Sequence, residues 1–221
     1  MSLTASPTLV APAASSRMAA TVAFTGGLIS LALVPALAII RPDLAPGAHV
    51  MSEYAIGYAP LGILFFVSQS VGCLGLAIAL ASVADSRAMR AGIWLLLAAA
   101  FGLALAVFCP MDPLTTPAGQ ETMQGNLHGV SALIGIPSFI AATLVLASAL
   151  KKKPEWRSAA PWLTGFAHTT WISLVLMIAC MVLLLAAHVT VMGEFVGYAN
   201  RLLVIAYALF LMVAAMPLLK R

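Results

Sequence analysis

Residues 197–219 read GYANRLLVIAYALFLMVAAMPLL and contain a single charged side chain, Arg201. As an α-helix rising about 1.5 Å per residue, this stretch is long enough to cross the roughly 30 Å hydrocarbon layer of a bilayer. Inside that layer the backbone finds hydrogen-bond partners only within a helix or a closed barrel. No strand-like alternation of polar and apolar residues competes with the helical interpretation, so the stretch predicts a transmembrane helix.

Five further apolar runs of similar length precede it, over residues 18–40, 59–82, 91–109, 126–150 and 162–187. The first run resembles a secretion signal, because Ala36-Leu37-Ala38 looks like a cleavage site, but it is longer than the usual apolar core of a signal. We therefore predict an all-α integral membrane protein, a bundle of about six transmembrane helices.

The composition of the whole chain agrees with this prediction. Of its residues 62% are hydrophobic and only 8% are charged, whereas soluble domains have about 25% charged residues. The net charge of +4 comes from short basic clusters between the apolar runs. This pattern indicates membrane topology and excludes a nucleic-acid partner.

We expect two regions, a disordered lead over residues 1–16 and a single transmembrane bundle over residues 17–221. The lead consists mostly of Ser, Thr, Ala and Pro without periodicity.

Loop charges predict the orientation of the bundle. If the N-terminus is inside, the outer segments carry only two basic residues, Arg41 and Arg201. The inner segments carry nine, which are Arg17, Arg87, Arg90, Lys151, Lys152, Lys153, Arg157, Lys220 and Arg221. By the positive-inside rule both termini are cytoplasmic. Trp156 and Trp162 flank an inner loop, where we expect both indoles to lie at the membrane interface.

Polar side chains gather at the opposite, outer end of the predicted bundle. If the fourth helix begins near residue 120, steps of three and four residues place one group of them on a single helix face, namely Glu121, Gln124, His128, Ser131 and Gly135. A polar stripe in lipid is expected to face the bundle interior.

Arg201 lies just inside the predicted membrane boundary, where a cation requires a partner. The outer acids Glu53, Asp112 and Glu194 are the candidates. We expect Glu53, Asp112, His128 and Arg201 to converge at the outer end.

Several short motifs now suggest a relationship. They are Ser52-Glu53-Tyr54-Ala55, Pro110-Met111-Asp112, Thr115 with Thr116, Gly125 with His128-Gly129, and Gly197 with Asn200-Arg201. Over most of residues 20–219 the chain resembles the bacterial "domain of unknown function" family 998. The resemblance implies a six-helix multi-pass protein of the bacterial cytoplasmic (inner) membrane, with no established reaction. The recurrent polar residues of that family map to Glu53, Asp112, His128 and Arg201.

One group of functions involves binding. Arg201 and His128, oriented by the carboxylates, would hold a lipid head group or another small ligand, with membrane lipids as partners. Alternatively, the chain is an accessory subunit bound to other membrane-protein subunits. The polar cluster of Glu53, Asp112, Glu121, Gln124, His128, Glu194 and Arg201 would then be only a structural cap that fixes the loops.

A second group involves chemistry. A hydrolase acting at the outer face would use a metal such as zinc held by His128, Asp112 and Glu53, with Glu121, His188 and Glu194 as further ligands. A metal-free variant would use Asp112 and His128 as base and orienting group. A haem protein would use His128 and His188 as axial ligands. No HExxH or other paired-histidine motif selects among these, so the substrate and cofactor stay open.

Overall fold

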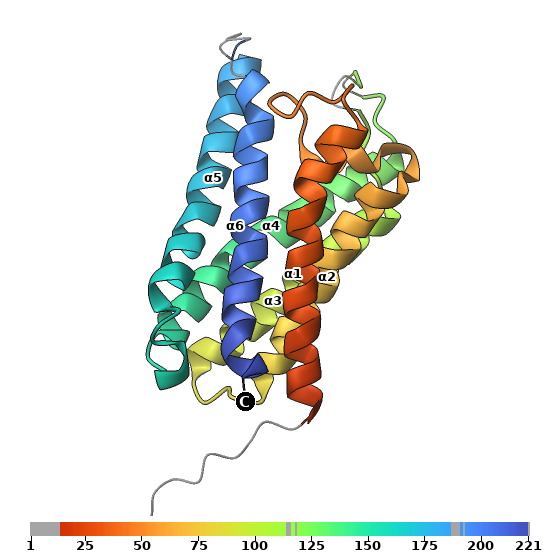
Figure 1. Cartoon of the computed structure of the whole chain (residues 1–221). Helices are drawn as coiled ribbons and strands as arrows, with labels where there is room; N and C mark the ends of the chain where they lie inside the picture. The colour runs from red at the N-terminus through yellow and green to blue at the C-terminus, as the bar shows by residue number, and fades with distance from the viewer. Residues whose placement is uncertain (1–13, 114–115, 118, 187–190, 192, 221) are drawn as a thin grey trace, which may run out of the picture.

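The computed structural model describes residues 14–113, 116, 117, 119–186, 191 and 193–220, and the regular structure in these parts is entirely helical (Figure 1). The long helices are α1 Ala14–Ile40, α2 Pro60–Ala81, α3 Arg87–Phe108, α4 Met123–Leu150, α5 Ala160–Ala186 and α6 Gly193–Leu219. Two short 3-10 helices lie between them, η1 Met51–Tyr58 and η2 Pro154–Trp156. All six long helices are long and apolar enough to cross a membrane, which confirms the predicted all-α bundle of six spans.

The bundle has two ends with different contents. At the terminal end lie the start of α1, the end of α6 and the segments 82–86 and 151–159 (Figure 1). At the loop end lie the segments 41–59, 109–113 and 119–122. The cytoplasmic position of the terminal end remains a prediction. So does the division into a lead and a bundle, since residues 1–13 lie outside the described residues and Ala14–Ser16 already belong to α1.

The helices pack around the bundle mainly as sequence neighbours. α1 contacts both α2 and α6, while α2 packs on α3, α3 on α4, and α5 on α6; α4 and α5 share a smaller contact. The contact between α1 and α2 depends on small residues, because a Cβ at Gly75 would lie 2.8 Å from the carbonyl oxygen of Ala19. Such close backbone approach is typical of helices packed in lipid.

Two groups of buried side chains form the core. The larger group joins all six helices, and a smaller group at the loop end includes Met51, Tyr54, Phe65, Phe66 and Val204.

The two inner-loop tryptophans differ in their surroundings. Trp156 was expected at the interface, but its side chain is fully buried and its Nε1 donates to the carbonyl of Ala214 at 3.0 Å. A carbonyl acceptor on α6, within reach of the last residue of η2, explains this difference. Trp162 is 63% exposed, as an interfacial indole should be.

Candidate functional site at the loop end

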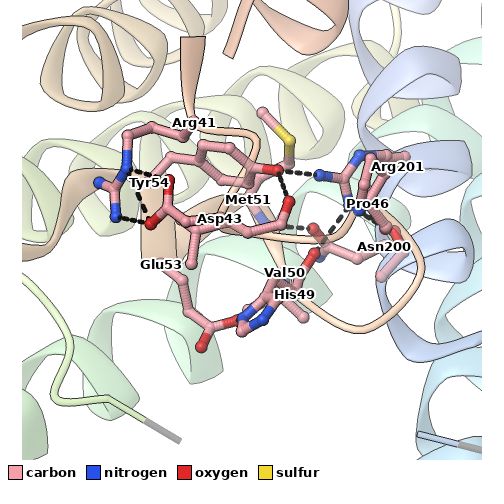
Figure 2. Close-up of polar contacts among 12 residues, drawn as sticks. Arg41, Asp43, Pro46, His49, Val50, Met51, Glu53, Tyr54, Asn200 and Arg201 are labelled. Carbon is pink, nitrogen blue, oxygen red and sulfur yellow. Dashed lines mark hydrogen bonds and ion pairs between the residues drawn. The ribbon is translucent and has the colours of Figure 1, made fainter. Parts of the chain in front are cut away.

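Arg201 is buried on the third turn of α6, with its guanidinium among backbone carbonyls (Figure 2). Its Nη1 donates to the carbonyls of His49 at 2.7 Å and Gly197 at 3.2 Å, and also to that of Pro46. Its Nη2 donates to the hydroxyl of Tyr54 at 2.7 Å. Among the described residues no carboxylate lies within ion-pair distance of Arg201. The expected acidic partner is therefore replaced by backbone carbonyl groups. Their oxygens carry partial negative charge and accept hydrogen bonds from the cation.

The segment 45–49 reaches Arg201 because it packs directly on α6. The amide of Gly197 donates to the carbonyl of Gly47 at 2.6 Å. A Cβ at Gly197 would lie 2.6 Å from the carbonyl oxygen of His49, so only glycine permits this approach. Asn200 adds a second bond, since its Oδ1 accepts from the amide of Met51 at 2.8 Å. Together these contacts fix η1 against the first two turns of α6.

Glu53 stabilises the same loop from within. Its carboxylate, only 5% exposed, accepts from the amide of Val50 at 3.0 Å and lies 3.1 Å from Nδ1 of His49. The bond from the Val50 amide is one half of a capping box at the start of η1, since the valine side chain cannot supply the reciprocal bond. Glu53 therefore supports the loop that binds Arg201, without contacting the guanidinium.

A second polar group lies at the start of α4. Asp112 accepts from the amide of Thr122 at 2.7 Å and from its hydroxyl at 2.9 Å. The Thr122 hydroxyl in turn accepts from the amide of Gly125 at 3.0 Å, so it caps the helix. A carboxylate at this position also interacts favourably with the helix dipole.

His128 connects α4 to the end of α3. Its side chain is buried, with Nδ1 2.8 Å from the carbonyl oxygen of Cys109 and the ring edge-to-face with Phe66 at 5.8 Å. Ser131 and Gly135 are buried on the same face, as the predicted stripe requires. Glu121 and Gln124 are exposed, because α4 begins only at Met123 and its first turn extends beyond the packed part of the bundle.

The structure thus arranges the predicted site residues in two groups. Asp112 and His128 share no hydrogen bond or ion pair with Glu53 or Arg201 in the part of the chain described. Glu194 is exposed on the first turn of α6. Within the described ranges no group of three or more His, Cys, Asp or Glu side chains could hold a metal ion. His188, the second haem candidate, lies outside the described residues.

A partly open cavity lies between the two groups. It consists of two adjoining spaces of ≈ 70 Å³ and ≈ 60 Å³, which share Ser52, Phe66, Leu103 and Ile136 as lining residues. The first space is further lined by Met51, Phe65, Gln69, Phe139, Ile140, Asn200, Leu203, Val204 and Tyr207. The second reaches His128, Ser131 and Gly135. The walls of the whole cavity thus come from η1, α2, α3, α4 and α6.

Gln69 is the most unusual residue of this cavity. Its side chain is only 3% exposed, and its Nε2 has no hydrogen-bond partner in the described structure. Sequence reasoning did not select it, although an amide in the middle of the apolar run 59–82 was a usable signal. Tyr54 and Asn200 were likewise missed as partners of the loop, despite lying beside Glu53 and Arg201 in the sequence.

Comparison with known proteins gives one match. The family model described as "Protein of unknown function (DUF998)" matches residues 4–217, which is nearly the whole chain. The searches of curated proteins and of solved structures found no match. The six apolar helices and this match agree with the resemblance noted in the sequence, and the chain belongs to the DUF998 family.

Proposed function

We propose that this protein binds a lipid-like molecule in the cavity at the loop end, where Gln69 donates a hydrogen bond to a neutral oxygen of the ligand. The observation that carries the proposal is the Gln69 carboxamide, which lines the cavity while its Nε2 has no partner among the described residues. Buried polar groups without a partner are rare in native proteins and call for a water or a ligand. A carbonyl, ether or hydroxyl oxygen in the cavity would satisfy this amide.

The walls specify the rest of the bound group. Phe65, Phe66, Phe139 and Leu103 make most of the lining apolar. None of the described residues that line either space is Lys, Arg, Asp or Glu, so an ionised group would be desolvated there without a counterion from them. The enclosed part of the ligand is therefore uncharged.

The volume limits how much of the ligand is enclosed. The two spaces measure ≈ 70 Å³ and ≈ 60 Å³, and an engineered apolar cavity of about 150 Å³ binds benzene. The cavity suits one ring or a short hydrocarbon segment, with the remainder of the molecule in the bilayer. A molecule of this kind partitions into the membrane, which then serves as its reservoir.

In this proposal the polar cluster positions the site. Arg201 and Asn200 hold η1, and η1 contributes Met51 and Ser52 to the cavity wall. Both Nη atoms of Arg201 are already bonded to carbonyls and to Tyr54, and Arg201 is not among the described residues that line either space. We therefore place the ligand at Gln69 and assign Arg201 the role of a positioning residue.

Two photoreactive probes of equal length test the proposal, an alkyl ketone and an alkane that each carry a diazirine. After irradiation in lipid nanodiscs, peptide mapping should find the ketone attached at Leu103 or Ile136. The variant Gln69→Leu should reduce ketone labelling about five-fold, which corresponds to one ordinary hydrogen bond. Labelling by the alkane should stay the same in this variant, because it makes no such bond.

The matched control is Gln120→Leu, at an exposed glutamine in the loop before α4. It should label as the unmodified protein does. Equal ketone labelling of the unmodified protein and Gln69→Leu would refute the role of Gln69. If neither probe labels the cavity peptides more than the lipid-facing residues Val182 and Leu183, the cavity holds water and the proposed function is wrong.

A further inference from the structure

A second hollow lies at the opposite end of the molecule, between η2, α5 and α6. It is an open groove of ≈ 400 Å³ lined by Glu155, Ser158, Ala159, Trp162, Phe166, Val213, Met216, Pro217 and Lys220. Figure 1 shows α5 and α6 running side by side to this end of the bundle. On α6 the groove begins at Val213, beyond the last cavity residue Tyr207, and it shares no lining residue with the loop-end cavity.

One side of the groove is apolar and faces lipid. Trp162 is 63% exposed and stacks on Phe166, with ring centroids 6.2 Å apart. Met216 is 41% exposed, and Val213 lies one turn before it on α6. An exposed indole beside aliphatic side chains is typical of the boundary between head groups and acyl chains. This wall suits the upper part of an acyl chain.

The other side of the groove carries one charge of each sign. Lys220 is exposed just after the end of α6, and Glu155 is partly buried in η2. The exposed Ser158 contributes a hydroxyl group. Glu155 also interacts within the protein, but a carboxylate has about four lone-pair positions and can accept a further donor.

The position of Glu155 depends on its neighbour in η2. The Trp156 side chain is fully buried and donates from Nε1 to the carbonyl of Ala214 at 3.0 Å. This bond holds η2 against α6, the helix that leads to Lys220. Glu155 and Lys220 are therefore carried by two elements, η2 and α6, that are bonded to each other at the membrane boundary.

We infer that this groove binds the head group of an aminophospholipid such as phosphatidylethanolamine. The lipid phosphate lies at Lys220 and Ser158, its primary ammonium lies at Glu155, and its first methylene groups lie on Trp162 and Met216. The pair of opposite charges favours this choice. A purely anionic head group would meet repulsion from Glu155, and a quaternary choline has no N–H to donate to the carboxylate.

Native mass spectrometry of the purified full chain tests this assignment. The protein is loaded with phosphatidylethanolamine, phosphatidylcholine or phosphatidylglycerol of identical acyl chains, and the retained lipid is counted after release from the micelle. The unmodified chain should retain phosphatidylethanolamine best. Glu155→Gln should lower its retention about two- to five-fold, the range for one partly exposed ion pair, without lowering that of phosphatidylglycerol.

Lys220→Ala should lower the retention of all three lipids, because each of them contains the phosphate. Lys152→Ala is the matched control, since Lys152 is an exposed lysine in the same terminal-end loop but does not line the groove. Size-exclusion chromatography shows whether each variant is folded, and a Lys220→Arg variant, which keeps the charge, should restore binding if Lys220→Ala aggregates. Equal effects of Lys220→Ala and Lys152→Ala, or a preference for phosphatidylglycerol, would overturn the assignment.

Discussion

Tyr54 joins three parts of the loop end through a single oxygen atom. Its hydroxyl donates to the carbonyl of Leu44 at 2.8 Å and accepts from Nη2 of Arg201 at 2.7 Å. The Cζ atom of Arg201 also lies 5.5 Å from the centroid of the tyrosine ring. The segment after α1, the short helix η1 and the start of α6 thus depend on one phenol.

Replacing Tyr54 by phenylalanine removes both hydrogen bonds but keeps the ring. The carbonyl of Leu44 and one N–H of Arg201 then lose a partner, so we expect the free energy of unfolding to fall by about 1–3 kcal/mol. Denaturant titration in detergent measures this loss. Tyr198→Phe is the control, because Tyr198 is 57% exposed and should change stability little. Equal effects of the two substitutions would show that the Tyr54 hydroxyl contributes nothing.

The same residue gives the protein a dependence on alkaline pH. Burial raises the pKa of the Tyr54 phenol, although the nearby Arg201 opposes this effect. The unfolded chain releases the proton near the ordinary pKa of about 10, and the folded chain releases it only at higher pH. The contribution of Tyr54 is therefore complete below about pH 10 and declines as the pH rises through the raised pKa of the folded state. In the Tyr54→Phe variant, the free energy of unfolding should lack this part of the decline at alkaline pH.

Among the elements, α4 shows most clearly how a loop residue determines a helix start. Asp112, in the loop that follows α3, accepts from Thr122, and Thr122 caps α4. The carboxylate lies directly against Gly125 on the first turn, where a Cβ would contact its oxygen and carboxyl carbon, the latter at 2.5 Å. A Cβ at Gly129, one turn later, would have no atom within 4 Å.

These two glycines form a matched pair of substitutions. Gly129→Ala should be neutral or stabilise the protein by up to about 1 kcal/mol, because alanine favours the helix. Gly125→Ala should destabilise it by about 1–2 kcal/mol, because the added methyl group displaces the Asp112 cap. Thermal unfolding of the two variants in one detergent compares them. If both alanines raise the midpoint, Asp112 does not pack against α4 in the way described.

The helices were predictable because their length is set by the thickness of the hydrocarbon layer, and apolar runs record that length directly. The predictions of the helix ends were less accurate. The fourth run was expected from residue 126, but α4 starts at Met123 because Thr122 and Asp112 supply a cap before the apolar residues begin.

The loop-end contacts were only partly predictable. The need of Arg201 for a partner follows from burial of a cation, but its carbonyl partners depend on the approach of Gly47 to Gly197. That approach is a property of the folded chain and leaves no periodic signal. The cavity at Gln69 was not predictable for the same reason, since its lining comes from five separate elements.

At the scale of the whole molecule, the unequal charge of the two ends predicts its orientation. Gln120 and Lys152 are both exposed, at the loop end and the terminal end respectively. A cysteine at position 120 should react with an impermeant maleimide added to intact cells, and a cysteine at position 152 should react only after permeabilisation. The buried Cys73 and Cys109 and the half-buried Cys180 define the background in the unmodified chain. If the cysteine at position 152 reacts in intact cells and the one at position 120 reacts only after permeabilisation, the predicted topology is inverted.

The helix α6 lines both hollows of the molecule, with Asn200 and Tyr207 at the cavity and Val213 and Met216 at the groove. If the proposed ligand in the cavity favours one position of this helix, its binding would change the affinity of the groove at the other end of the bundle. Thermodynamic linkage makes such an effect reciprocal, so the lipid in the groove would alter affinity in the cavity by the same factor. The lipid bound at one end of the bundle would then regulate ligand binding at the other end, and no chemical messenger would have to cross the bilayer.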